Sequence, residues 1–267
     1  MTLEEYKKEL EYIEKQYGGE EALYPLINIF LRELGDFKPL NKQDPSLVDV
    51  HRGRLCKYAS RNLLYGISNF PDMVIMGKDF AYKDNQLNYK KDLIDEKSKL
   101  FGCIEVKDLS EKLDEIMDNT KKITLKYCNE KSMFCYKEDD QNYTEVNQLY
   151  GDVLWYGKVI HTNGKIWNYY EIENKTLKDV NEFLMNYYFQ FMKTRCNNNA
   201  QIVKDFYETV QGFSNNLDNE KDNEKEVIIT MKTIANLDSL DSNKVECEWN
   251  NLITFFKKIQ WANSKPK

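Results

Sequence analysis

Two carboxylates and a lysine stand at the ends of short apolar segments. Asp72 opens the apolar run 73–76, and Glu105 and Lys107 end the next such run. On a β-strand, residues two apart point to the same face, so Glu105 and Lys107 would project together. Phosphodiester hydrolysis needs carboxylates that hold a divalent cation and a donor that steadies charge on the phosphate. These residue types therefore predict a metal-dependent hydrolase site.

Each of these residues also has a simpler interpretation. Asp72 follows a proline, and Pro-Asp is ordinary turn chemistry. Glu105 and Lys107 could form a solvated ion pair that protects an edge strand. The apolar residues 102–104 before them favour a central strand, where charge requires a reason. For the cation we expect Mg²⁺, with Mn²⁺ as a possible substitute, because oxygen ligands suit both.

Pro71-Asp72 followed by Glu105-Val106-Lys107 resembles the PD-(D/E)xK signature of the restriction-endonuclease-like nuclease superfamily. The surroundings are most similar to the N-terminal nuclease domain of type I restriction enzyme R subunits and related standalone proteins. This resemblance implies that Asp72 and Glu105 are metal ligands and that Lys107 is catalytic.

Three further segments carry the same resemblance, which covers roughly residues 20 to 172. Glu21, chosen over Glu20, would add a carboxylate to the metal site from the first apolar helix. Gln148 would be a catalytic neighbour, accompanied by Tyr156. Residues 159–167 look like the family's closing hairpin. Glu21 could instead be a helix-dipole partner, and Gln148 an ordinary surface residue. The long spacer between Asp72 and Glu105 and an insertion at 109–143 depart from the pattern.

The resemblance implies an Mg-dependent endonuclease that acts on DNA in restriction, phage or defence-related processing. The alternative is a non-catalytic interaction protein, an inhibitor or adaptor in a defence system, because fold does not fix function. A homodimer or a protein partner bound through the C-terminal part stays open. The chain has no G-x-x-x-x-G-K-[ST] loop, which argues against an ATP-driven motor.

Composition sets limits on these functions. The 267 residues carry a net charge of −6, so contact with phosphates would have to be local. The six cysteines form no CxxC pair, which favours reduced thiols in the cytoplasm over structural zinc. No apolar run approaches the roughly 20 residues that span a membrane. For His161 a structural imidazole is expected, and for Lys121, Lys122, Lys126 and Arg195 solvated charges.

Hydrophobic periodicity predicts an α/β (α+β) fold, in which helices flank a central mixed sheet. A restriction-endonuclease-like core would occupy residues 1–175, and a mainly helical C-terminal extension residues 176–267. Asn163-Gly164 indicates a hairpin between two of the strands. The expected strands are 73–76, 101–106, 158–161, 166–170 and 227–229, and the expected helices are 3–17, 20–34, 109–117, 143–156, 176–195, 200–213 and 249–261.

Overall fold

The computed structural model describes most of the chain before residue 174 and a second block near the C-terminus. The described residues are 1–34, 45–50, 63–65, 70–77, 80, 97–116, 120–128, 133–136, 144–145, 147–173 and 226–261. The helices predicted at 176–195 and 200–213, including Arg195, lie outside these ranges.

A mixed sheet of nine strands forms the centre of the molecule, in the order β1-β2-β3-β7-β8-β9-β4-β5-β6. The pair β3–β7 is parallel, and every other neighbouring pair is antiparallel. The strands are β1 (Pro45–Asp49), β2 (Met73–Gly77), β3 (Leu100–Val106), β4 (Lys121–Cys128), β5 (Met133–Tyr136), β6 (Thr144–Glu145), β7 (Lys158–Thr162), β8 (Ile166–Ile172) and β9 (Glu226–Asn236).

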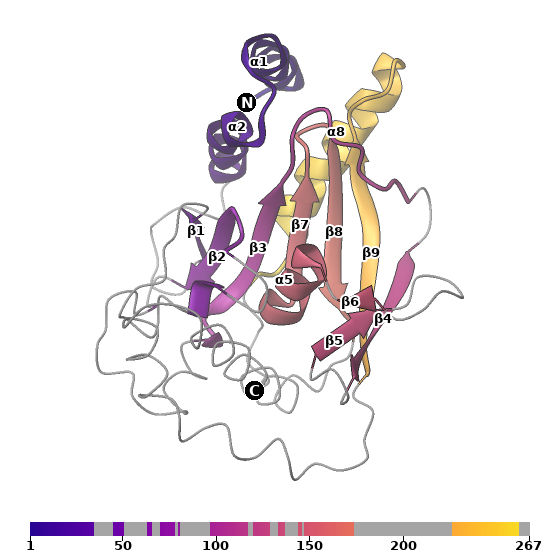
Figure 1. The fold of residues 1–267 in the computed structure, drawn as a ribbon. Coiled ribbons are helices and arrows are strands. Elements are labelled where there is room, and N and C mark those ends of the chain that lie inside the picture. Colours follow the sequence, from indigo (N-terminus) through magenta and orange to yellow (C-terminus); the bar gives the residue numbers. More distant parts are fainter. Residues whose placement is uncertain are drawn as a thin grey trace.

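Helices cover both faces of this sheet (Figure 1). Helix α5 (Gln148–Tyr156) packs on one face, while α1 (Leu3–Gln16), α2 (Glu20–Glu33) and α8 (Ser242–Lys258) pack on the other. A short 3₁₀ helix, η1 (Leu63–Tyr65), lies on the α5 side. The mixed α/β class predicted from the sequence is therefore confirmed. Among the described helices, none is both long and apolar enough to cross a membrane.

Alternation along the strands divides the core into two layers. In β3, Cys103 points to the layer that contains α5, whereas Ile104 and Val106 point to the layer that contains α2 and α8. Both layers are buried, with Trp155 in the first and Trp167 in the second, each about 1% exposed or less. A strand buried on both faces needs a nearly continuous apolar sequence, which β2 and β3 have.

The hairpin at Asn163-Gly164 forms as predicted and is held by α1. Gly164 has a φ of 84°, a conformation that side chains disfavour. The Asn163 side chain accepts hydrogen bonds from the backbone N–H groups of Lys165 and Ile166. Tyr6 of α1 donates to the Gly164 carbonyl at 2.8 Å. This hydrogen bond ties the turn between β7 and β8 to α1.

The helix predicted at 109–117 is wrong for the described residues 109–116, which form an irregular loop. Two asparagine side chains bind carbonyl groups of this loop: Asn163 donates to Glu111 and Asn168 to Asp114, both at 2.8 Å. Thr233 accepts the Ile116 N–H. Because these partners lie on three different strands or turns, the segment is stretched across the ends of the strands rather than coiled. The predicted helix 143–156 is shorter than expected and begins at Gln148, after β6.

The described part of the predicted C-terminal extension, residues 226–261, contains one strand and one helix. Strand β9 is 11 residues long and lies between β8 and β4 in the central sheet. Its residues Val227, Ile229 and Met231 pack in the α5 layer, whereas Ile234 and Ala235 pack in the opposite layer with α8. Only residues 227–229 were predicted as a strand, because apolar and polar residues are mixed in the remainder of β9. Residues 226–261 thus continue the core structurally.

Gly102 of β3 lies close to the ring of Trp261, the last described residue. A Cβ atom there would lie 2.7 Å from the Trp261 ring and 2.9 Å from the Lys158 carbonyl oxygen. We expect Gly102→Ala to lower the free energy of unfolding by about 1–3 kcal/mol, because the backbone of β7 cannot move aside easily. Urea denaturation measures the change. The double variant with Trp261→Leu should recover part of the loss relative to Trp261→Leu alone; equal losses in both backgrounds would contradict contact with the ring.

Candidate active site

The candidate site lies where β2 begins and β3 ends. These strands are antiparallel, and Met73 pairs with Ile104, so Asp72 is placed beside Glu105. Both residues follow the alternation of Val74 and Cys103 and point toward the α5 layer. They are buried, at 6% and 3% exposure. The sequence prediction that neighbouring strands bring the two carboxylates together is consistent with this register.

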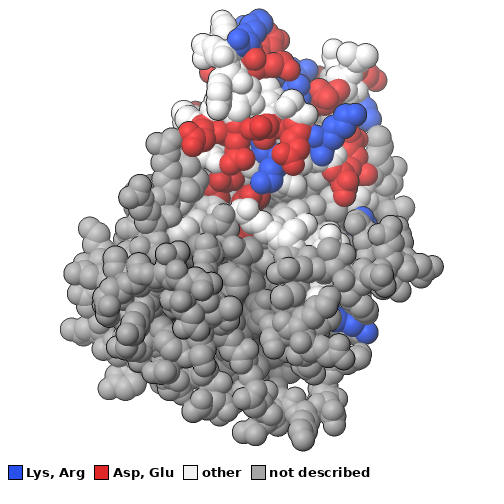
Figure 2. Space-filling model, in the orientation of Figure 1, with Lys and Arg blue, Asp and Glu red and all other residues white. Residues whose placement is uncertain are grey.

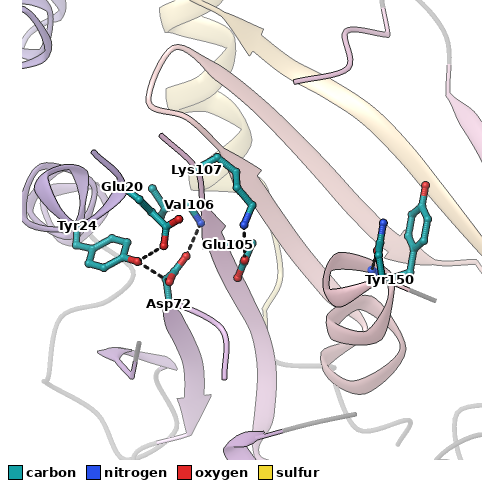
Figure 3. Close-up of polar contacts among 8 residues, drawn as sticks. Glu20, Tyr24, Asp72, Glu105, Val106, Lys107 and Tyr150 are labelled. Atoms are coloured by element: carbon teal, nitrogen blue, oxygen red, sulfur yellow. Dashed lines mark hydrogen bonds and ion pairs between the residues drawn. The ribbon is translucent and has the colours of Figure 1, made fainter. Parts of the chain in front are cut away.

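Asp72 accepts hydrogen bonds from two groups, one on α2 and one on β3 (Figure 3). The Tyr24 hydroxyl donates to Oδ1 at 2.7 Å, and the Val106 backbone N–H donates to Oδ2 at 2.7 Å. The same Tyr24 hydroxyl lies at hydrogen-bond distance from the Glu20 carboxylate. Tyr24 and Glu20 are one helical turn apart on α2, so this helix contributes both a hydroxyl and an acid to the site.

Glu105 and Lys107 form an ion pair at the end of β3. Lys107 Nζ lies 2.8 Å from Glu105 Oε1. The lysine side chain keeps 25% exposure, whereas that of Glu105 keeps only 3%. The second carboxylate oxygen, Oε2, is buried without a hydrogen-bond partner. The alternative of a solvated edge pair does not fit this pair, because Glu105 is buried and β3 lies between β2 and β7.

Burial shifts the proton affinities of these groups. Removal from water raises the pKa of Asp72 to about 6, although the hydrogen bonds from Tyr24 and Val106 oppose the shift. Burial and the Asp72 charge raise the pKa of Glu105 to about 7, against the effect of Lys107. Burial alone would lower the pKa of Lys107, but Glu105 raises it overall. Near neutral pH the two acids thus favour sharing a proton or gaining a cation.

The structure connects Glu20, rather than the predicted Glu21, to the site. Glu21 is exposed, and successive helical residues point about 100° apart. Asp108, in the loop after Lys107, accepts the Glu20 backbone N–H at 2.6 Å and so caps α2, whose own N-cap residue is a glycine. This contact fixes the start of α2 beside the end of β3. The sequence could not fix the rotation of the helix closely enough to separate two adjacent glutamates.

Gln148 is the first residue of α5 and is half-buried. Its role beside the site stays a prediction. One turn later on the same helical face lies Asp152, which is completely buried and has no hydrogen-bond partner for either carboxylate oxygen. Burial, together with the charges of Glu105 and Asp72, raises its pKa well above the usual range. Asp152 was not among the residues predicted from the sequence, although an aspartate within the apolar segment 149–156 is a visible signal.

His161 is the second residue whose place the sequence did not indicate. It pairs in register with Glu105 across the parallel strands β3 and β7. Burial and the Lys107 charge lower its pKa to about 4, so the imidazole is neutral near pH 7. Neither ring nitrogen has a hydrogen-bond partner. The expected structural histidine, satisfied by hydrogen bonds, is therefore not what the described residues show.

The residues present fit a hydrated divalent cation better than a fully protein-bound one. Within the described ranges, no three His, Cys, Asp or Glu side chains converge as a ready-made metal site. Asp72 and Glu105 offer two buried carboxylates, and Glu105 Oε2 is an unpartnered buried acceptor. Mg²⁺ keeps several waters and is often bound through one or two carboxylates. Asp72 and Glu105 could hold such an ion.

The Tyr24 hydroxyl is expected to set the charge state of Asp72. In Tyr24→Phe, the loss of this hydrogen bond should raise the pKa of Asp72 above about 6, because the bond favours the carboxylate. At pH 8 the variant should lose roughly 1.5–3 kcal/mol of unfolding free energy. Carboxyl ¹³C NMR titration and urea denaturation measure the two effects. Tyr17→Phe, at a residue 77% exposed, is the control, and an unchanged Asp72 titration would contradict the assignment.

Comparison with known proteins adds no relative to this description. No family model, no curated protein and no solved structure matches the chain.

Proposed function

We propose that this chain is a divalent-cation-dependent nuclease that hydrolyses DNA phosphodiester bonds. The observation that carries the proposal is the convergence of Asp72, Glu105 and Lys107, two buried acids with raised pKa values beside one partly exposed lysine. Perturbed acids of this kind gather at functional sites. The resemblance of 71–72 and 105–107 to the PD-(D/E)xK signature supports the same reaction, and it points to restriction, phage or defence-related processing.

The chain's own residues divide the work of hydrolysis. A divalent cation supplies a water of lowered pKa and neutralises charge on the phosphate when bound. Asp72 and Glu105 would hold it, with Tyr24 and the Val106 N–H fixing the orientation of Asp72. Lys107 is exposed enough to reach a phosphate oxygen or the attacking water. The water oxygen bonds to phosphorus, the bond to one sugar oxygen breaks, and that oxygen leaves with a proton.

Charge on the described surface limits how DNA can be bound. Figure 2 shows acidic side chains gathered on the described part of this face. The loop after Lys107 contributes the exposed residues Asp108, Glu111, Asp114 and Glu115. Phosphates would be repelled there unless cations intervene. This acidic surface favours one second candidate, the non-catalytic interaction protein, whose partner would present basic side chains.

Cleavage assays test the proposal directly. Plasmid DNA and single-stranded DNA are incubated with Mg²⁺, Mn²⁺ or EDTA, using the wild type, Asp72→Asn and Glu105→Gln. Glu246→Gln, which neutralises an exposed glutamate on α8, serves as the matched control. We expect cutting that requires the cation, persists in Glu246→Gln and is lost in the two site variants.

Other outcomes separate the two candidates. Absence of cutting by folded wild-type protein under every condition would refute the nuclease and favour the interaction protein. Cutting that survives in Glu105→Gln and Asp72→Asn would assign the activity to other residues or to a contaminant.

A further inference from the structure

Unpartnered polar atoms gather beside the candidate site. Among the described residues, six buried side-chain nitrogen and oxygen atoms lack a hydrogen-bond partner, and five of them belong to Glu105, Asp152 and His161. Buried polar groups in folded proteins almost always have partners. Their concentration at one place indicates that something polar completes the site.

The three residues come from neighbouring elements. Glu105 and His161 are paired in register on β3 and β7, and α5, which carries Asp152, packs on both strands. Asp152 is fully buried on this helix, and its charge and that of Glu105 both raise the pKa of the Cys103 thiol on β3. Asp152 is therefore buried where α5 packs on the two strands that carry Glu105 and His161.

Charge at this place is not balanced by the chain. Asp72, Glu105 and Asp152 act on one another electrostatically, and Lys107 is the basic side chain whose charge acts on all three. His161 adds no charge when neutral. Lys107 alone cannot balance these three acids and Glu20 when all of them are ionised, and a bound divalent cation would supply two further positive charges.

Direct ligation by all three acids does not fit the geometry, because no three such side chains converge among the described residues. Water can bridge the remaining distance. Mg²⁺ releases its waters reluctantly, and carboxylates that bind those waters tune affinity from the outer shell.

We propose that Asp152 is a positioning residue of the cation site, whose carboxylate accepts hydrogen bonds from the waters of a cation held by Asp72 and Glu105. This inference rests on the cation site of the proposed function, but it does not require that the substrate be DNA. It assigns a role to a buried acid that otherwise only destabilises the fold.

Asp152→Asn tests the inference, because it keeps the shape and removes the charge and one acceptor. Mn²⁺ affinity is measured by electron paramagnetic resonance and by calorimetry in the absence of DNA. We expect the dissociation constant to rise about 10–100-fold in Asp152→Asn. Asp114→Asn, which removes the same charge from the exposed loop, should change it little. Glu105→Gln should abolish binding.

A second measurement covers the case in which Asp152→Asn fails to fold. Electron–nuclear double resonance on wild-type protein counts the waters on bound Mn²⁺, and several are expected. Few or no bound waters would overturn the outer-shell role, and so would wild-type affinity in Asp152→Asn. If the wild type binds no cation, this inference and the nuclease proposal both fail. If cation binding depends on Asp152 but DNA is not cut, the nuclease proposal alone fails.

Discussion

Lys107→Met should reduce cation-dependent cleavage by on the order of 10²–10³-fold, the usual loss when one preorganised donor to a developing charge is removed. The lysine is the described basic group at the site, 2.8 Å from Glu105 and partly exposed. Cation affinity should rise in this variant, because a positive charge has been removed from beside the carboxylates. Single-turnover cleavage and Mn²⁺ binding measure the two quantities separately.

Lys244→Met on α8 is the control for Lys107→Met, since it removes an exposed lysine on another element. Cleavage at the wild-type rate in Lys107→Met would leave the lysine without a catalytic role. Simultaneous loss of cleavage and of cation binding would indicate that the ion pair maintains the shape of the site instead.

Without a divalent cation, the free energy of unfolding should fall as the pH rises from about 4 to about 7. The pKa of Asp72 is raised to about 6 and that of Glu105 to about 7, from ordinary values of 3.8 and 4.5. In this window the folded state binds more protons than the unfolded state, so stability declines with pH. The decline should be on the order of 3 kcal/mol for each group.

Urea denaturation in EDTA at several pH values measures this decline. Added Mg²⁺ should reduce this decline, most strongly near pH 7, because cation binding stabilises the charged carboxylates. The double variant Asp72→Asn/Glu105→Gln should show a smaller slope in EDTA and little response to Mg²⁺. A wild type whose stability rises steadily from pH 5 to 8 in EDTA would contradict the raised pKa values.

Local sequence signals predicted the elements that carry the site. Continuous apolar runs identified β2 and β3, and Asn163-Gly164 identified the β7–β8 hairpin, because turn chemistry and burial are decided within a few residues. The loop at 109–116 was mistaken for a helix because its determinants, the side chains of Asn163, Asn168 and Thr233, are distant in sequence. The length of β9 depends similarly on pairing with β8 and β4.

The site itself was predictable only where it coincides with a motif. Asp72, Glu105 and Lys107 are fixed by strand alternation and by one antiparallel register. Asp152 and His161 join them only through the packing of α5 and the parallel pairing of β3 with β7. The packing of α5 and the pairing of β3 with β7 cannot be inferred from spacing along the chain. The same holds for the rotation of α2 that turns Glu20 toward Tyr24 and Asp72.

The position of β9 also determines the order in which the molecule can be completed during synthesis. Until residues 226–236 leave the ribosome, β8 on one side and β4 on the other have an unpaired edge where β9 will lie. Open edges of this kind attract other chains. Until β9, the last described strand, joins the two parts of the sheet, these edges can pair with strands of other chains. We therefore expect folding to be slow and sensitive to chaperones.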